Sequence, residues 1–440
     1  MLRFLNTGNR SPPGLRLIGL SRRWFSANTT VMSFGDGSQG ALGLADSTIG
    51  VASDAYEPTP IPSLPPDVSS VAAGHYHSLA VTSGGHLWSW GRNSESQLGR
   101  PHLSPRETWN KPQKVEGLNQ VKIISAFASG VISAAIGDDG TLWVWGKSRR
   151  GQLGLGKDIT EAILPTKVDA LRGQDIVKVS LGWGHALALT KDGKLFGWGY
   201  YADGRLGKIG NLSEASPLDS FAGKLKSSNS NTMIESAEKL VLEAIEKEKD
   251  MPIIWQPTLI EELCDIEVVD VACGLDHSLV LCSDGTLLSG GSNVYGQLGR
   301  AKQDLGLHAV DTSHLSPISI ASGLGHSFAI CKNIPLDGLS VVTWGWNQNS
   351  QLGREGPENI PLVVECLDGE MPISVSGGRV HSIAVTGKRE VWSWGCGRNG
   401  RLGLGSSVDE VEPMANQYLE GYEVLQAVAG FDHSLVLVAG

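Results

Sequence analysis

The stretch that decides the fold is Gly74-His75-Tyr76-His77-Ser78-Leu79-Ala80-Val81, followed by Leu87-Trp88-Ser89-Trp90-Gly91 and Gln97-Leu98-Gly99. Its histidine part returns five times, at His185, His277, His326, His381 and His433. Its Trp-Gly part and weaker copies of it close at seven glycines: Gly35, Gly91, Gly146, Gly199, Gly291, Gly345 and Gly395. These glycines are separated by 56, 55, 53, 92, 54 and 50 residues, and such a period is the mark of a repeat architecture.

Each repeat has the two-residue alternation of β-strands, with a turn such as Asp139-Gly140 or Asp192-Gly193 between the histidine part and the Trp-Gly part. Repeated antiparallel strands of this kind are typical of a β-propeller. A degraded copy, Gly130-Val131-Ile132-Ser133, is read with Ser133 at the histidine position. We predict an all-β, seven-bladed propeller with one helical insertion, closed by pairing of strands 31–35 and 433–438, because each end holds half a repeat.

The motifs Gly-x-x-His-Ser-Leu-Ala-Val, Trp-Gly-x-Asn and Gly-Gln-Leu-Gly resemble the repeats of the regulator of chromosome condensation family, over about residues 31–440. The resemblance implies a seven-bladed propeller. It leaves the activity open, because the family includes a nucleotide-exchange factor for the GTPase Ran, a plant UV-B photoreceptor and various scaffolds. A fold hosts many functions, so the function has to be argued from the site.

Residues 1–25 are interpreted as a mitochondrial transit peptide. They contain five arginines and no acidic residue, as organelle-targeting segments do. Arg23, Phe25 and Ser26 resemble the processing site of plant mitochondrial presequences, with cleavage after Phe25. The alternative is a basic tail that binds nucleic acid. We therefore expect a protein of the mitochondrial matrix that resembles plant mitochondrial members of the family.

The charge balance argues against direct binding of nucleic acid by a broad basic surface. The chain has 36 basic and 46 acidic residues, and loss of the five N-terminal arginines would leave 31 against 46, a net charge of −15. An acidic protein lacks the field that drives nonspecific binding to nucleic acid. No apolar run reaches the roughly 18 residues that a membrane-spanning helix needs. We expect contact with RNA to be indirect, through protein partners.

Residues 208–257 interrupt the period and are predicted to be an insertion. A Ser- and Asn-rich stretch comes first, and an amphipathic helix is predicted over 232–249, where Thr232 and Glu235 form a capping box. The apolar stripe of this helix either packs on the propeller or serves as a partner-binding arm.

Sequence signals for catalysis, cofactors and metals are weak, and we predict none of the three. The Gly-x-Gly-x-x-Gly matches at Gly35 and Gly395 lie in blade turns. Dinucleotide binding requires such a motif between a strand and a following helix, so these matches do not predict it. The repeated histidines are assigned to blade packing, with a ring nitrogen bonded to a neighbouring backbone carbonyl. His75 and His77 could share a face, but no third metal ligand is evident.

The variable positions of the Gly-x-x-His loops are the best candidates for a binding site, because loops on a rigid scaffold usually carry function. Fourteen such side chains are expected to ring one end of the propeller, and for Val131, Ile132 and Leu324 we favour a role in plugging the channel mouth. Photoreception by coupled indoles is disfavoured, because only Trp183 is a tryptophan at the first variable position. The predicted partner-binding residues are the following: His75, Tyr76, Trp183, Asp276, Arg379, Phe431 and Asp432.

The leading hypothesis is a non-enzymatic mitochondrial scaffold that supports RNA processing or splicing, and thereby biogenesis of respiratory complexes. Its expected partners are RNA-binding splicing or processing factors. The alternative is a guanine-nucleotide exchange factor for a mitochondrial GTPase, either small or dynamin-like.

Overall fold

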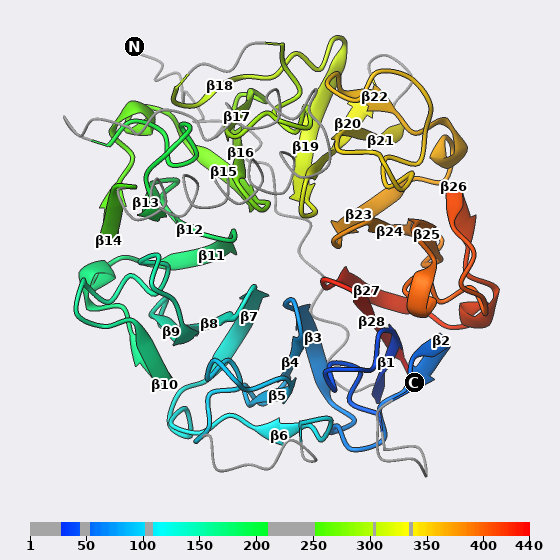
Figure 1. Cartoon of the computed structure of the whole chain (residues 1–440), viewed down its shortest axis with the longest axis horizontal. Helices are drawn as coiled ribbons and strands as arrows, with labels where there is room; N and C mark the ends of the chain where they lie inside the picture. The colour runs from blue at the N-terminus through cyan, green and yellow to red at the C-terminus, as the bar shows by residue number, and fades with distance from the viewer. Residues whose placement is uncertain (1–27, 45–52, 102–108, 210–250, 302–304, 334–337) are drawn as a thin grey trace, which may run out of the picture.

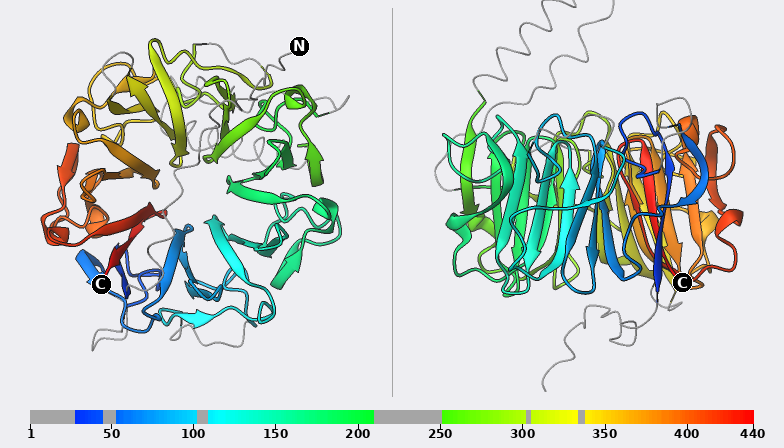
Figure 2. Two further views of the ribbon diagram at one scale, coloured as in Figure 1. Left: turned by 180° about the vertical axis from the view of Figure 1, so that it is seen from behind. Right: turned by 90° about the horizontal axis from the view of Figure 1, so that it is seen from below.

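The fold is a ring of seven antiparallel four-stranded sheets around a central opening (Figures 1 and 2). The structure is a computed structural model of the chain and describes residues 28–44, 53–101, 109–209, 251–301, 305–333 and 338–440. The predicted all-β, seven-bladed propeller is therefore confirmed within these residues. The blades are, in order: blade 1, β27 (Val424–Ala429), β28 (His433–Ala439), β1 (Thr29–Gly35) and β2 (Ala55–Pro60); blade 2, β3 (Val68–Ala73), β4 (His77–Thr82), β5 (Leu87–Gly91) and β6 (Gln113–Lys114); blade 3, β7 (Ile123–Ser129), β8 (Ile132–Gly137), β9 (Leu142–Lys147) and β10 (Glu161–Lys167); blade 4, β11 (Ile176–Leu181), β12 (His185–Thr190), β13 (Leu195–Tyr200) and β14 (Ile253–Leu259); blade 5, β15 (Val268–Cys273), β16 (His277–Cys282), β17 (Leu287–Gly291) and β18 (His308–Ala309); blade 6, β19 (Leu315–Ser322), β20 (His326–Asn333), β21 (Leu339–Gly345) and β22 (Leu362–Val363); blade 7, β23 (Pro372–Gly377), β24 (His381–Thr386), β25 (Val391–Gly395) and β26 (Glu410–Ala415).

Blade 1 closes the ring by joining the two ends of the chain, as predicted. Strands β1 and β28 pair antiparallel without interruption, from Thr29 opposite Ala439 to Gly35 opposite His433. The pairing covers the hydrogen-bonding edge that each strand would otherwise expose. It also buries Phe34 completely.

Neighbouring blades are joined by hydrogen bonds that explain why three motifs recur together. In blade 2, Ser78 Oγ and Trp90 Nε1 both donate to the carbonyl of Ala41 in blade 1, each over 2.8 Å. Equivalent serine–tryptophan pairs converge on the carbonyls of Gln97, Gln297 and Gln351. The His-Ser, Trp-Gly and Gly-Gln-Leu-Gly motifs are thus parts of one contact between blades.

The repeated histidines pack inside the molecule, but their predicted bonding partner is wrong. Each ring Nε2 meets the serine Oγ of the next blade rather than a backbone carbonyl, as in His77–Ser133 at 2.8 Å. In five of the six pairs the serine already donates its proton to a carbonyl, so the network assigns those imidazoles as neutral with the proton on Nε2. The six pairs are as follows: His77–Ser133, His185–Ser278, His277–Ser327, His326–Ser382, His381–Ser434 and His433–Ser78.

Blade 3 departs from the pattern, and here the sequence register was misread. Ile132 pairs with Gly146 as His77 pairs with Gly91, so Ile132 and not Ser133 occupies the histidine position. The preceding loop has the same length as in the other blades, but its glycine stands one position later, since Ser129 and Gly130 occupy the places of Gly74 and His75 in blade 2. The serine position of blade 4 is Ala186, and both side chains lie in one apolar cluster. A polar pair has been replaced as a pair, which avoids leaving a buried group unsatisfied.

Glycine at the end of each Trp-Gly motif is required by close approach of two strands. Gly91 has a φ of +105°, and a Cβ atom there would lie 2.4 Å from the carbonyl oxygen of Tyr76. Both conditions exclude other residues, which is why this glycine marks the period so reliably.

The predicted transit peptide, with Arg23, Phe25 and Ser26, and the predicted helix over 232–249 lie outside the described residues. Strand β14 is the outer strand of blade 4 and overlaps the end of the predicted insertion, so the blade resumes by Ile253. Among the residues that the structure describes, no helix is long and apolar enough to cross a membrane.

Candidate partner-binding rim

The Gly-x-x-His loops form a rim around one mouth of the central channel. Backbone N–H groups link successive loops: Phe431 donates to Gly74 at 3.1 Å, and Arg379 donates to Phe431 at 3.1 Å. Further bonds of this kind join Leu324 to Gly378, Leu275 to Leu324, and Trp183 to Leu275. Across the described loops, this chain of bonds is interrupted only at blade 3, where Gly130 stands at the position that His75 has in blade 2. Six of the seven loops are therefore held rigidly in one ring.

Four of the predicted binding residues form an aromatic cluster on the rim: His75, Tyr76, Trp183 and Phe431. The His75 ring stacks on Trp183, with centroids 5.2 Å apart and planes inclined by 17°. Its other neighbour is Phe431, at 4.4 Å, and Tyr76 lies edge-on to Phe431 at 5.5 Å. The stack of His75 on Trp183 joins blade 2 to blade 4 across the loop of blade 3.

The electrostatics of the cluster favour a neutral imidazole. Burial, together with smaller effects of the nearby His433 ring and Arg379 guanidinium, lowers the pKa of His75 to about 4. The ring is therefore uncharged at neutral pH and stacks as an aromatic. Trp183 remains 37% exposed, so the cluster is open to a partner.

Three arginines cover the outer faces of the cluster. The guanidinium carbons of Arg150, Arg379 and Arg92 lie 5.1 Å, 4.8 Å and 5.6 Å from the ring centroids of Trp183, Phe431 and Tyr76. These distances are those of cation–π contacts. Sequence reasoning selected Arg379 but missed Arg92 and Arg150. The available signal was their place in the loops after Trp-Gly motifs, which emerge at the same end as the Gly-x-x-His loops.

The two predicted acidic residues are engaged in ion pairs within the rim. Asp276 accepts from Arg205 Nη1 at 2.8 Å, and Arg205 is almost fully buried. Asp432 accepts from Arg379 Nη2 at 2.8 Å and lies 3.1 Å from Arg401 Nη2. Arg205 and Arg401 occupy the glutamine position of the Gly-Gln-Leu-Gly motif in blades 4 and 7. Both carboxylates therefore help to join blades.

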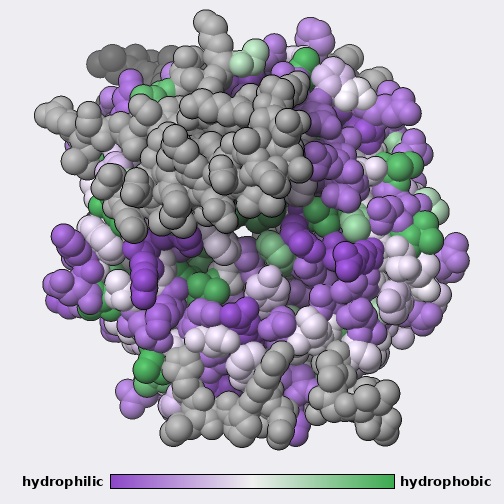
Figure 3. Space-filling view, in the orientation of Figure 1, coloured by the Kyte–Doolittle hydropathy of each residue, from purple (hydrophilic) through white to green (hydrophobic). Residues whose placement is uncertain are grey.

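The seven predicted residues are divided between two places. Six lie together: the aromatic cluster and the adjoining pair of Arg379 and Asp432. Asp276 lies on the blade 4–blade 5 side of the rim. On the surface facing the viewer in Figure 3, hydrophobic side chains emerge beside the central opening among hydrophilic ones.

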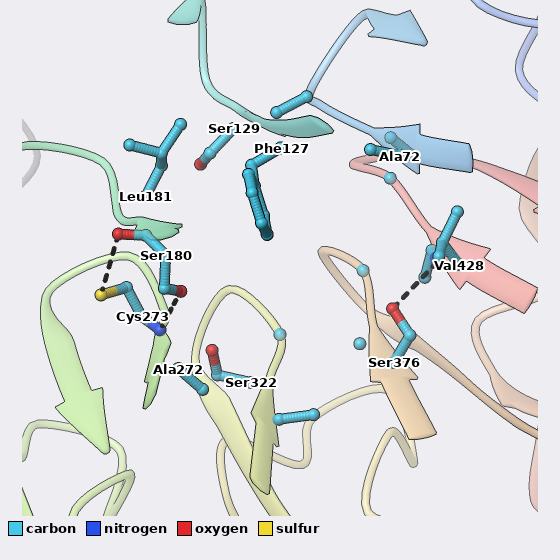
Figure 4. A pocket seen from close by; sticks show the side chains of 18 of the residues that line it. Ala72, Phe127, Ser129, Ser180, Leu181, Ala272, Cys273, Ser322, Ser376 and Val428 are labelled. Carbon is cyan, nitrogen blue, oxygen red and sulfur yellow. Dashed lines mark hydrogen bonds between the residues drawn. The ribbon is translucent and has the colours of Figure 1, made fainter. Parts of the chain in front are cut away.

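The central channel is a hollow of about 470 Å³, lined mainly by small side chains of the innermost strands and also by rim residues, among them His75, Trp183 and Phe431 (Figure 4). Phe127 is the large exception among those labelled, and Ser180 and Ser376 bond to backbone N–H groups of the next blade. Burial raises the pKa of the Cys273 thiol to about 11, so it is not an activated nucleophile. Among the described residues, no group of three or more His, Cys, Asp or Glu side chains could hold a metal ion.

Comparison with known proteins decides the family. The model of the RCC1-like domain matches residues 30–436. The chain belongs to the RCC1-like domain family. A relative within it is the ultraviolet-B receptor UVR8 of Arabidopsis thaliana, 30% identical over 392 residues, which are 87% of this chain and 76% of UVR8. In the human E3 ubiquitin-protein ligase HERC2 the match is 29% identical over 81% of this chain, but it spans 7% of that protein.

The RCC1-like fold is also seen in a solved structure of Prp20p from Saccharomyces cerevisiae. It has a TM-score of 0.73 at 22% identity and covers 94% of this chain and 92% of that chain. The ring stacked on Trp183 in this RCC1-like chain is an imidazole and not a second indole.

Proposed function

We propose that this chain is a non-enzymatic interaction propeller that binds a protein partner at its Gly-x-x-His rim. The observation that carries the proposal is the aromatic cluster with its three covering arginines, assembled from loops of several blades. Aromatic residues and arginine dominate binding hot spots, because they bury large areas and make directed polar contacts. A rigid ring of backbone bonds keeps these loops ordered before binding, which reduces the entropy lost on association.

We place this partner in mitochondria, where the chain would act as a scaffold for RNA processing or splicing and so support respiratory complexes. The arginine-rich, acid-free residues 1–25 support the location. The net charge of −10 supports indirect contact with RNA, through basic RNA-binding proteins. Imaging of a fluorescent fusion of residues 1–25 tests the location, and a signal confined to cytosol or nucleus would refute it.

Crosslinked capture from mitochondria tests the rim. The full chain, a Trp183→Ala variant and a Tyr422→Ala variant are compared. Tyr422 is 46% exposed and precedes β27, at the opposite end of the propeller from the rim, so it is a matched control. We expect partners to be lost with Trp183→Ala and kept with Tyr422→Ala. Equal capture by all three proteins would refute binding at the rim. Normal intron removal and RNA abundance in a loss-of-function line would refute the role in RNA processing.

A second candidate is an exchange factor for a mitochondrial GTPase. The RCC1-like fold suggests it, because Prp20p, whose structure is similar, binds Gsp1p and histones. The two rim acids, Asp276 and Asp432, are already paired with arginines, which leaves them less able to displace a nucleotide or its metal ion. Nucleotide-release assays with matrix and inner-membrane GTPases test this candidate. Absence of acceleration for every GTPase would exclude it.

A further inference from the structure

The chemistry of the rim also indicates what kind of partner segment it binds. Resting on the proposed function, we infer that the rim binds an acidic peptide segment, whose carboxylates pair with the arginines that cover the aromatic cluster. Three observations lead to this inference: the ring faces are occupied, Arg92 and Arg379 each keep the Nη1 group in addition to the donors that bind internal partners, and arginines gather at the rim of an acidic chain.

The aromatic faces of the cluster are already covered. His75 lies between Trp183 and Phe431, at 5.2 Å and 4.4 Å. Arg150 and Arg379 lie over the same two outer rings. Stacking of nucleobases needs a free ring face, which is how single-stranded nucleic acid is held on aromatic platforms. The arrangement therefore disfavours RNA as the direct ligand.

The arginines can bind carboxylates while they remain on the rings. A guanidinium uses its flat face for a ring and keeps its N–H donors in its plane. Two arginines of the rim already lie over a ring and donate to a carboxylate at the same time. Arg379 contacts Phe431 and donates to Asp432 at 2.8 Å, and Arg92 contacts Tyr76 and donates to Glu95 at 2.7 Å. These internal carboxylates show the geometry that acidic side chains of a partner would adopt.

The charge of the rim contrasts with that of the whole chain. The chain has a net charge of −10, yet each of three cluster rings carries an arginine, and Glu95 and Asp432 offset the charge of two of the three. The side chains of Arg92 and Arg379 are 32% and 37% exposed, so partner carboxylates can approach them. An acidic segment is thus drawn to this mouth and repelled by most of the remaining surface.

Peptide selection tests the inference without knowledge of the partner. A display library of random 12-residue peptides is selected for binding to the full chain. The affinity of the selected peptides is then measured for the unchanged chain, for a R92Q/R150Q variant and for a R172Q/K191Q variant. The second variant removes the same charge at the opposite end, where Arg172 and Lys191 are largely exposed. Thermal unfolding of each variant confirms that it is folded.

We expect the selected peptides to be enriched in Asp and Glu, to bind about tenfold more weakly to R92Q/R150Q, and to be unaffected by R172Q/K191Q. Selected peptides without an acidic excess, or acidic peptides that bind all three proteins equally, would overturn the inference. Stronger binding of a fluorescein-labelled 20-residue oligouridylate than of the peptides, lost in R92Q/R150Q, would overturn it in favour of RNA. If Trp183→Ala abolishes partner capture while the peptides are not acidic, the proposed function stands and this inference alone fails.

Discussion

Acidification should unfold this protein steeply, because six buried histidines must remain neutral in the native state. Burial lowers the pKa of His77 and His326 to about 3 and that of His277 and His433 to about 4. The pKa of each of the other two, at positions 185 and 381, also falls well below the ordinary value, chiefly through burial. In the unfolded chain all six return to about 6.5.

The sign follows from which state takes up protons first. As the pH falls below 6.5, the unfolded chain binds protons that the native state cannot accept until about pH 4, so the free energy of unfolding decreases. Each histidine contributes a loss of about 1.3 kcal/mol between pH 7 and pH 5.5. Six contribute about 7.5 kcal/mol, which is comparable with the whole stability of many proteins.

The assay is urea unfolding followed by tryptophan fluorescence at intervals of half a pH unit from 7.5 to 5. Near pH 5 the dependence of the free energy on pH should correspond to uptake of nearly seven protons, six by these histidines and one by His75, whose pKa is also lowered to about 4. A His277→Gln variant keeps a donor for Ser327 and does not titrate, so it should reduce the uptake by about one proton. Uptake of fewer than about three protons, or an unchanged slope in His277→Gln, would refute the assignment of the ring as neutral and buried.

Three further predictions concern the blade contacts, the closure and the thiols. His277→Ile and Ser327→Ala should each lower the free energy of unfolding by about 1–3 kcal/mol. The double variant copies the apolar pair of Ile132 and Ala186, so its loss should be at least about 1 kcal/mol smaller than the sum of the two single losses. Strict additivity of the losses measured by urea unfolding would contradict this prediction. Removal of β1 together with the residues before it should cost about 6 kcal/mol of stability, since the buried apolar side chains of Val31, Met32 and Phe34 leave blade 1, whereas removal of residues 1–27 alone should not; equal unfolding temperatures would show that the closure is dispensable. Exposed Cys264 and Cys366 should react first with a thiol reagent and the buried thiols only on unfolding, so rapid modification of all six in native protein would contradict the described burial.

The sequence was sufficient for the architecture because the repeat period, the Trp-Gly glycines and the half-repeats at the ends are all local signals. The position of Gly91, for example, reports a backbone geometry that only glycine can adopt. The rim could also be located, since the Gly-x-x-His loops of consecutive repeats must emerge at the same end.

Contacts between blades could not be read in this way. The serine partner of each histidine lies about one repeat away, and nothing in a single repeat identifies it. The register of blade 3 was not evident because Gly130 stands one position later than the glycine of the other loops, so Ser133 could be aligned with either the histidine or the serine of the motif. Arg92 and Arg150 were overlooked because their role depends on rings contributed by other loops.

The break in the backbone hydrogen bonds at the loop of blade 3 has a geometrical consequence for recognition. Seven similar blades would offer a partner seven nearly equivalent rotational settings about the channel axis. The gap in the backbone ring, bridged by His75 and Trp183, occurs at one blade among the described loops and abolishes that degeneracy. A rigid ligand bound there has a single rotational orientation about the channel axis. Any other protein bound to that ligand is therefore held in a fixed orientation relative to the propeller.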